Sequence, residues 1–252
     1  MKALEFVRLM VPPIFSRTTR RHLRDVWRHH IPTLTHERTL DRFQATGFAP
    51  KTIYDIGAFR GHWTKEARRI FPSAAFYLFE ANNLNAPFLE KTGHPFFIAA
   101  MSDKDDEAGA PLFINETIQT NTSLHRERTQ SFNSNVKIVH VPTKRLDRLV
   151  TEKGLPMPDL IKLDVQGAEI DVLKGAGMVL EGASAIIAEL SFLPFNAGAP
   201  LIGETITYIE SLGFKCADVC ETHSSAIGGI LQMDIIFARP TLFQRYAAAA
   251  GL

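Results

Sequence analysis

The stretch Thr52–Gly61 (TIYDIGAFRG) is a short apolar run that ends in a glycine-rich turn. The next segment, His62–Phe71, has apolar residues at helical spacing, which predicts an amphipathic helix. A buried strand that passes through a glycine turn into a helix is a common unit of α/β folds. Free backbone N–H groups at the start of such a helix favour a bound anion. The stretch therefore predicts both a fold class and a ligand site.

Strand-like and helix-like segments alternate along the rest of the chain. Further strands are predicted at Ala75–Glu80, His94–Met101, Pro111–Asn115, Val136–Val141, Leu160–Val165, Ala185–Leu190, Phe214–Cys220 and Met233–Ala238. Further helices are predicted at Leu84–Lys91, Lys144–Glu152, Glu169–Leu180 and Ile202–Leu212. This alternation predicts a doubly wound α/β fold with a mostly parallel sheet. The last two strands have no room for a helix between them, so we expect them to pair antiparallel.

The composition is that of an ordinary globular protein. The chain has 252 residues, 45% apolar and 22% charged, with a formal net charge of +1. These values exclude a disordered chain and predict no nucleic-acid partner. No run of about 18 apolar residues is present, so we expect no membrane-spanning helix. Cys216 and Cys220 are too few for a disulfide framework, and we expect buried free thiols in a reducing, cytoplasmic compartment.

The N-terminal part of the chain is basic. Residues 1–40 hold eight Lys and Arg against three acidic residues, and they include several large apolar residues. We divide the chain into a basic, helical N-terminal extension at residues 1–48 and a ligand-binding domain at residues 49–252. Residues 1–30 are suited to peripheral contact with an anionic membrane, at its inner face. The alternative is a helical cap with a solvated basic face, which is the commoner meaning of a charge run.

The glycine turn differs from the dinucleotide-binding fingerprint. Asp55, Gly57 and Gly61 form a D-x-G-x-x-x-G pattern, with Ala58 and Phe59 where the fingerprint needs its middle glycine for a pyrophosphate. The pattern favours a ligand without a pyrophosphate, such as S-adenosylmethionine. The alternative is a tight turn between strand and helix in which Asp55 acts as a local cap.

Two further strand ends carry polar residues that fit such a cofactor. Glu80 closes the second predicted strand, where a carboxylate can accept hydrogen bonds from both ribose hydroxyls. The third predicted strand leads into Ser102 and Asp103, and Asp103 could accept from the adenine amino group. A solvated Glu80 and a turn-forming Ser-Asp pair are the alternatives.

These motifs resemble one known family. The segments DIGAFRGHW, FEAN and IKLDVQGAEIDVLKGA are similar to the FkbM family of S-adenosylmethionine-dependent methyltransferases, and the similarity runs from about Thr52 to Arg239. The resemblance implies a class I methyltransferase fold of seven strands with the last one antiparallel. It implies that Gly57, Gly61 and Glu80 bind the cofactor. It also implies methyl transfer, usually to a hydroxyl of a sugar, glycolipid or polyketide. Gln166 stands where many relatives have Glu.

Methyl transfer to oxygen requires a group that orients the acceptor hydroxyl and removes its proton. Asp164, near the end of the strand predicted at Leu160–Val165, is the first candidate. Glu189, near the end of the strand predicted at Ala185–Leu190, is the second. His125 and His223 are weaker candidates in predicted loops. Asp164 alone makes a poor divalent site, so we assign no metal ligand, and the participation of a metal stays open.

Two loops and two rival functions complete the expectations. Thr117–Leu124 and Phe192–Pro200 are the expected substrate-facing loops, and a small-molecule or glycan acceptor is the expected partner. The oligomeric state stays open.

Two rival functions are also considered. One is a nicotinamide-dependent oxidoreductase on a related fold, and the other is a non-catalytic adaptor that binds the cofactor without transferring its methyl group.

Overall fold

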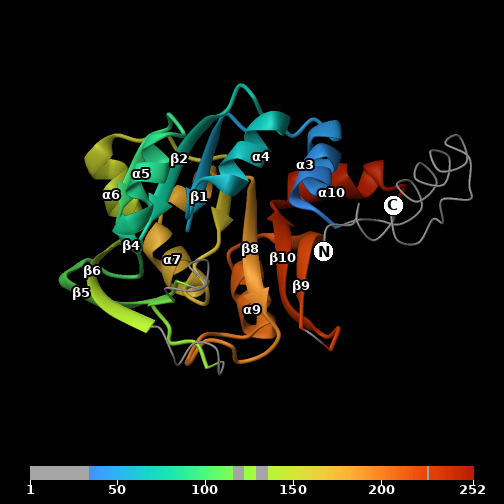
Figure 1. Cartoon of the computed structure of the whole chain (residues 1–252). Coiled ribbons are helices and arrows are strands. Elements are labelled where there is room, and N and C mark those ends of the chain that lie inside the picture. Colours follow the sequence, from blue (N-terminus) through green and yellow to red (C-terminus); the bar gives the residue numbers. More distant parts are fainter. Residues whose placement is uncertain (1–33, 116–121, 129–135, 226) are drawn as a thin grey trace, which may run out of the picture. The chain divides into compact units, whose positions relative to one another are not determined.

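A seven-stranded sheet forms the centre of the computed structural model, which describes residues 34–115, 122–128, 136–225 and 227–252 (Figure 1). Its strand order is β3-β2-β1-β7-β8-β10-β9. The strands are β1 (Thr52–Ile56), β2 (Ala75–Glu80), β3 (Phe96–Ile98), β7 (Leu160–Leu163), β8 (Ala185–Ser191), β9 (Lys215–Ser224) and β10 (Ile230–Ala238). β10 is antiparallel to both of its neighbours, while the other pairs are parallel. This order is that of a class I methyltransferase fold, which confirms the predicted fold class.

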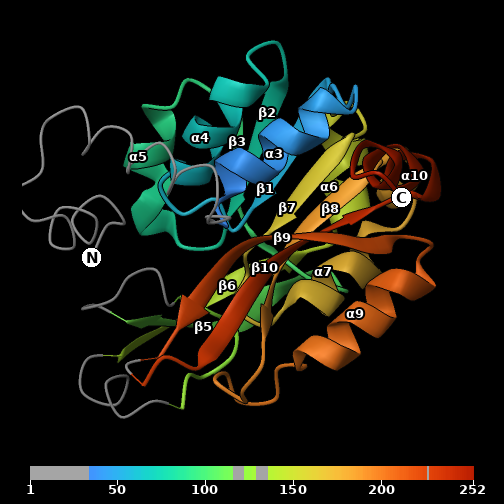
Figure 2. The same cartoon turned by 90° about the vertical axis from the view of Figure 1, so that its right-hand side faces the viewer.

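Helices cover both faces of the sheet (Figure 2). They are α3 (His36–Ala45), α4 (His62–Ile70), α5 (Ala86–Glu90), α6 (Leu146–Lys153), α7 (Glu169–Ala176), α8 (Val179–Gly182), α9 (Ile202–Ser211) and α10 (Pro240–Ala249), with a 3₁₀ turn, η1, at Asn83–Asn85. Apolar residues of α3, α4, α5 and α10 form one core with one face of the sheet. Residues of α6, α7, α8 and α9 form a second core with the other face. The two cores make the fold doubly wound.

A second, three-stranded sheet has the order β4-β6-β5, with β4 (Ala100–Met101), β5 (Asp106–Asn115) and β6 (Val136–Lys144). The segment His94–Met101 was expected to be one strand. In the structure it is divided, because β3 pairs with β2 in the large sheet while β4 pairs with β6 in the small one. The strands predicted at Pro111–Asn115 and Val136–Val141 are β5 and β6, and they pair antiparallel.

Three further predictions needed correction. The single helix expected at Glu169–Leu180 is split into α7 and α8 at Gly177, whose φ is +47° and where a Cβ would lie 2.5 Å from a carboxylate oxygen of Asp147. No helix was predicted after the last strand, but residues 240–249 form α10, which begins with a proline in its first turn, a favourable position. Both free cysteines lie in the edge strand β9, where Cys220 is buried as predicted but Cys216, near the start of the strand, is exposed.

Helix α3 belongs to the same compact unit as the sheet, which spans His36–Leu252. Leu40 and Phe43 are fully buried, and the ring of Phe43 stacks on Tyr246 of α10 with 4.4 Å between the ring centres. Residues 36–48, placed with the N-terminal extension by the sequence analysis, are thus packed on the sheet. The predicted membrane contact at residues 1–30 lies outside the described residues. Within the described part of the chain, no helix is long and apolar enough to cross a membrane.

Candidate functional site

A cavity of about 470 Å³ opens at the carboxyl ends of β1, β2, β7 and β8. β10 runs the other way, so its first half, with Gln232 and Asp234, also reaches the cavity. Its lining includes Asp55, Gly57, Glu80, Asp164 and Glu189, five of the eight predicted site residues. A cavity at this edge is where open α/β sheets bind their ligands.

The glycine loop, Asp55–Gly61, is shaped by contacts of its own backbone. The N–H groups of Gly57 and Ala58 both donate to the carbonyl oxygen of Phe79, at 2.9 and 3.0 Å. Gly57 has a φ of +82°, and a Cβ there would lie 1.8 Å from the carbonyl oxygen of Asp164. Only glycine fits, because the loop after β1 approaches the end of β7 so closely. Gly61 does not line the cavity, but its φ of +75° turns the chain into α4.

Asp55 is buried at the end of β1. Its carboxylate accepts a hydrogen bond of 2.5 Å from the hydroxyl of Thr64 in α4. Burial raises the pKa of Asp55 to about 6, against the opposing effect of Thr64. The residue thus joins β1 to α4, as in the local-cap alternative, and it also lines the cavity.

Glu80 is held by two backbone donors. One carboxylate oxygen accepts from the N–H of Phe59 in the glycine loop and the other from the N–H of Asn82, both at 2.7 Å. Burial raises the pKa of Glu80 to about 7, and these two hydrogen bonds lower it. Because each carboxylate oxygen has two acceptor positions, the group keeps acceptor capacity toward the cavity. Phe59 itself has a φ of +49°, a left-handed conformation that non-glycine residues rarely adopt.

The structure does not bring Ser102 and Asp103 to the cavity. The lining along this part of the chain ends at Met101. The backbone N–H of Ser102 donates to the carbonyl oxygen of Lys144, and the carbonyl oxygen of Asp103 accepts from the guanidinium of Arg145. Both residues thus contact the small sheet and the turn before α6, rather than the cavity.

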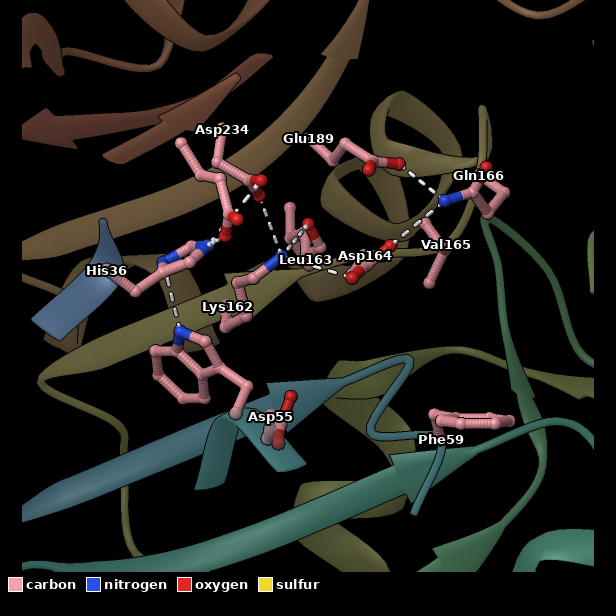
Figure 3. A network of polar contacts seen from close by, with 12 residues as sticks. His36, Asp55, Phe59, Lys162, Leu163, Asp164, Val165, Gln166, Glu189 and Asp234 are labelled. Carbon is pink, nitrogen blue, oxygen red and sulfur yellow. Dashed lines mark hydrogen bonds and ion pairs between the residues drawn. The ribbon is translucent and has the colours of Figure 1, made fainter. Parts of the chain in front are cut away.

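A buried lysine lies at the centre of the opposite side of the cavity (Figure 3). Lys162, only 2% exposed, places its ammonium nitrogen 3.0 Å from Oδ1 of Asp234 and 3.4 Å from Oδ2 of Asp164. Burial acts to lower the pKa of Lys162, but the neighbouring carboxylates outweigh it and raise the pKa. Burial likewise acts to raise the pKa of Asp234, yet the nearby cation holds that pKa well below its ordinary value. The ammonium therefore joins the strands β7 and β10 by charge.

Side-chain amides connect the other carboxylates. The amide nitrogen of Gln166 donates to Glu189 at 2.5 Å and to Asp164 at 3.3 Å, and the amide of Gln232 donates to Glu189 at 2.9 Å. Burial and the negative charges of Asp164 and Asp234 raise the pKa of Glu189 well above its ordinary value. A glutamate in place of Gln166 would add a third carboxylate where the structure has a donor. We call these residues the charged cluster: Lys162, Asp164, Gln166, Glu189, His223, Gln232 and Asp234.

The loop that carries Gln166 is fixed by several contacts. Gln166 has a φ of +52°, and its carbonyl oxygen accepts from Ser123 at 2.8 Å and from the side chain of Asn196 at 2.7 Å. The buried carboxylate of Glu169 accepts from the N–H of Gly167 at 3.1 Å. Glu169 is thus a structural residue of this loop, in addition to opening α7.

His36 completes this side of the cavity from helix α3. Its Nδ1 accepts a hydrogen bond of 3.1 Å from the indole N–H of Trp63. Its Nε2 lies 3.5 Å from Oδ2 of Asp234 and 3.7 Å from Oε2 of Glu221. Lys162, His36 and Asp234 were not among the predicted site residues. A charged residue inside an apolar strand (LIKL and MDIIF) was the available signal for Lys162 and Asp234.

Two groups of side chains lie close enough together to hold a metal ion: His36, Glu221 and Asp234, and Glu189, His223 and Asp234. The hydrogen bond from Trp63 occupies Nδ1 of His36, so Nε2 carries the hydrogen and offers no lone pair to a metal. Asp234 belongs to both groups, and the ammonium of Lys162 already neutralises its charge. The donor sets therefore fit a lysine-centred cluster better than a metal centre.

The predicted loops and histidines contribute unequally. Thr122, Ser123 and Leu124 line the cavity, while the rest of the Thr117–Leu124 loop lies outside the described residues. Phe192–Pro200 does not line it, and neither does His125. His223 lines the cavity from strand β9 rather than from a loop, with Nε2 3.2 Å from Oδ2 of Asp234.

The chain is remotely similar to several solved structures of methyltransferases. They include the precorrin-6y C5,15-methyltransferase of Geobacter metallireducens (13% identity, 81% of this chain and 86% of that chain, TM-score 0.44). A second is the magnesium protoporphyrin IX methyltransferase of Synechocystis with bound S-adenosylmethionine (10% identity, 94% of this chain and 91% of that chain, TM-score 0.43). A third is the 1,6-didemethyltoxoflavin-N1-methyltransferase of Burkholderia thailandensis (11% identity, 87% of this chain and 83% of that chain, TM-score 0.40). A comparison with curated proteins finds no match. The fold assignment rests on the strand order itself.

The methyltransferase FkbM domain matches residues 55–216, which is more than half of the chain. The matched segment begins at the glycine loop and contains Glu80, Asp164 and Glu189. The family match, the strand order and the cavity at the carboxyl ends of the strands agree with one another. The chain belongs to the FkbM family of S-adenosylmethionine-dependent methyltransferases.

Proposed function

We propose that this methyltransferase transfers the methyl group to a hydroxyl oxygen of a sugar, glycolipid or polyketide-type acceptor. The charged cluster is the observation that carries the proposal. It presents carboxylates and amides to the cavity beside the loop after β7. Hydroxyl groups both donate and accept hydrogen bonds, so a wall of fixed acceptors and donors is suited to a polyol.

The glycine loop and Glu80 are suited to the cofactor. S-adenosylmethionine carries a net positive charge, and acidic side chains predominate over the single lysine in the cavity lining. We assign the two ribose hydroxyls to Glu80, whose carboxylate is oriented by two backbone donors. Asp55, Gly57 and Gly61 fix the loop that faces the cofactor. Ser102 and Asp103 have no part in this assignment, because they lie outside the cavity lining.

The acceptor hydroxyl needs a base, and Asp164 is the residue best placed for this role. Its side chain is 41% exposed, so it is open to the cavity, while Lys162 and Gln166 hold its two oxygens. When bound, the cofactor supplies an electrophilic methyl group on its sulfonium. Asp164 accepts the proton that the acceptor hydroxyl loses. Glu189, whose pKa is raised well above its ordinary value by burial, orients the acceptor by hydrogen bonding.

The two rival functions are disfavoured for different reasons. A nicotinamide-dependent oxidoreductase disagrees with the family match and with the absence of a middle glycine in the glycine loop. A non-catalytic adaptor would need the cofactor residues but not the charged cluster. The hydrogen bonds from Gln166 to Asp164 and Glu189 argue against loss of the charged cluster.

The proposal is tested by incubating the protein with labelled S-adenosylmethionine and a panel of monosaccharides, glycolipids and polyketide alcohols. We expect a product that carries the methyl group on oxygen, located by mass spectrometry. The matched control is Asp164→Asn, which should bind the cofactor and give far less product. A methyl group found on nitrogen or carbon contradicts the proposal, and so does cofactor binding without transfer to any hydroxyl compound.

A further inference from the structure

The wall of the cavity includes three side chains that the methyl-transfer chemistry does not use. His36 comes from α3, Trp63 from α4 and Glu221 from β9, and all three line the cavity. His36 and Glu221 lie outside the segment 55–216 that matches the family. This part of the wall therefore joins two residues from outside the matched segment to Trp63, which lies within it.

Trp63 fixes the chemical state in which His36 faces the cavity. An indole nitrogen is a donor only, so Nδ1 of His36 must be the acceptor in the 3.1 Å hydrogen bond. The hydrogen of the neutral imidazole is then on Nε2. His36 is only 7% exposed, so its ring is held by packing as well as by this bond. His36 thus presents a fixed N–H donor to the cavity.

That N–H has no partner at ideal distance among the described residues. Nε2 lies 3.5 Å from Asp234 and 3.7 Å from Glu221, longer than the usual N–H···O range of about 2.7–3.2 Å. Asp234 already binds Lys162 and His223 more closely. The side chain of Glu221 is 45% exposed and accessible. A hydroxyl group placed between them can accept from His36 and donate to Glu221.

Trp63 adds an aromatic surface to the same place. Its N–H is used by His36, and the two rings meet edge to face with 6.2 Å between their centres. The indole is therefore held in one orientation while part of it stays exposed to the cavity. A fixed aromatic face beside a donor and an acceptor is suited to a sugar ring, which has C–H groups on its faces and hydroxyls at its edge.

We propose that His36, Trp63 and Glu221 form a subsite that binds a sugar ring of the acceptor and selects it over other hydroxyl compounds. The proposal rests on the proposed function and names the substrate class. Binding energy gained here, away from the reacting oxygen, positions the acceptor hydroxyl near Asp164. The subsite determines specificity for the acceptor, whereas the glycine loop and Glu80 bind the cofactor.

A binding experiment tests the subsite independently of catalysis. Saturation-transfer NMR on the protein loaded with S-adenosylhomocysteine, using methyl α-D-glucopyranoside as probe and sorbitol as the open-chain control, should show contact with the pyranoside ring protons and a weaker effect on sorbitol. The signal should be lost in His36→Phe and reduced in Glu221→Gln. Glu221 is partly exposed, so that variant keeps the test valid if His36→Phe is unstable. Glu37→Gln, on an exposed position of the same helix, is the matched control.

A kinetic experiment uses the acceptor found in the panel described above. We expect the acceptor KM to rise about tenfold in His36→Phe, with the affinity for S-adenosylmethionine unchanged, because one hydrogen bond to the acceptor is lost. His36→Gln keeps a side-chain N–H and should restore part of the loss. Folded His36→Phe and Glu221→Gln enzymes with an acceptor KM within twofold of wild type overturn the subsite. Pyranosides that do not contact the wild-type protein overturn it too. If no hydroxyl is methylated but the pyranoside contacts these residues, the proposed function fails and the subsite stands.

Discussion

At the ends of β1 and β2 the cavity wall is built by the backbone, whereas at the ends of β7, β8 and β10 it is built by charged side chains. In the first region, glycine conformations and main-chain N–H groups set the shape of the glycine loop and hold Glu80. In the second, Lys162 and two amides hold three carboxylates and a histidine together. Under the proposed function, one cavity combines a wall for the cofactor, formed by residues close in the sequence, with a wall for the acceptor, assembled from distant segments.

The largest expected effect comes from breaking the charged cluster at its centre. Lys162→Met keeps the length of the side chain but leaves Asp234 buried without its cation. We expect the free energy of unfolding, measured by urea titration, to fall by about 3–5 kcal/mol. Lys174→Met, which removes a surface pair with Asp171, is the control and should cost less than about 1 kcal/mol. Equal losses in the two variants would show that Lys162 does not hold the cluster together.

The two regions should differ in their response to pH. Burial raises the pKa of Asp55 to about 6 and of Glu80 to about 7, and neither has a close cation as Asp234 has. Between about pH 4.5 and pH 7 the folded chain therefore binds more protons than the unfolded chain, so stability falls as pH rises. We expect a fall of about 2 kcal/mol or more in the unfolding free energy between pH 5 and pH 7. In the charged cluster the raised pKa of Glu189 acts in the same direction. Asp234 acts in the opposite direction at low pH, where its protonation removes the pairing with Lys162 and destabilises the protein.

This pH response is checked by urea titrations at pH 5, 6 and 7 in the absence of cofactor. Glu80→Gln removes one of the titrating carboxyls and should make the fall smaller. A wild-type stability that rises through this range would contradict the raised pKa values of the two carboxyls.

A smaller effect is expected when Glu80 is replaced, and it concerns the affinity for the cofactor. Glu80→Ala should weaken the binding of S-adenosylmethionine by about 1–3 kcal/mol, because the ribose hydroxyls lose their acceptor. Isothermal titration calorimetry measures this directly, and Glu90→Gln, exposed on α5, is the control. Unchanged affinity in a folded Glu80→Ala protein would remove Glu80 from the cofactor site.

The smallest effect on the fold is expected from the N-terminal extension. The compact unit begins at His36, so removal of residues 1–30 should leave the melting temperature and the cofactor affinity unchanged. The same deletion should abolish binding to anionic vesicles, which the basic residues promote at low salt. If the full-length protein does not bind such vesicles at low salt, the predicted membrane contact is wrong. Deletion of residues 1–48 should instead destabilise the protein, because it removes the buried Leu40 and Phe43.

The sequence predicted the first region well because its signals are local. Asp55, Gly57 and Glu80 follow strands whose apolar runs are clear, and parallel strands bring their carboxyl ends to one edge. Asp164 and Glu189 were found by the same rule. The same rule also predicted Ser102 and Asp103 as site residues. The chain leaves the large sheet before β4, however, and these two residues lie outside the cavity lining.

The charged cluster could be predicted only in part because its contacts join distant segments. The pairing of Lys162 with Asp234 depends on the register of β8 between β7 and β10, and the place of His36 depends on how α3 packs. No local pattern encodes either. The conformation of Gly177 was missed for the same reason, since it is the nearby Asp147 that leaves no space for a side chain.

The central claim is that the charged cluster performs methyl transfer to a hydroxyl while the glycine loop and Glu80 only bind the cofactor. The most direct test is the single-turnover rate of Asp164→Asn with a hydroxyl acceptor, measured beside its affinity for S-adenosylmethionine. We predict a rate that falls roughly a hundredfold or more, with the cofactor affinity within twofold of wild type. A well-folded Asp164→Asn enzyme with a near-normal rate would contradict the account and would make Glu189 the first candidate for the base.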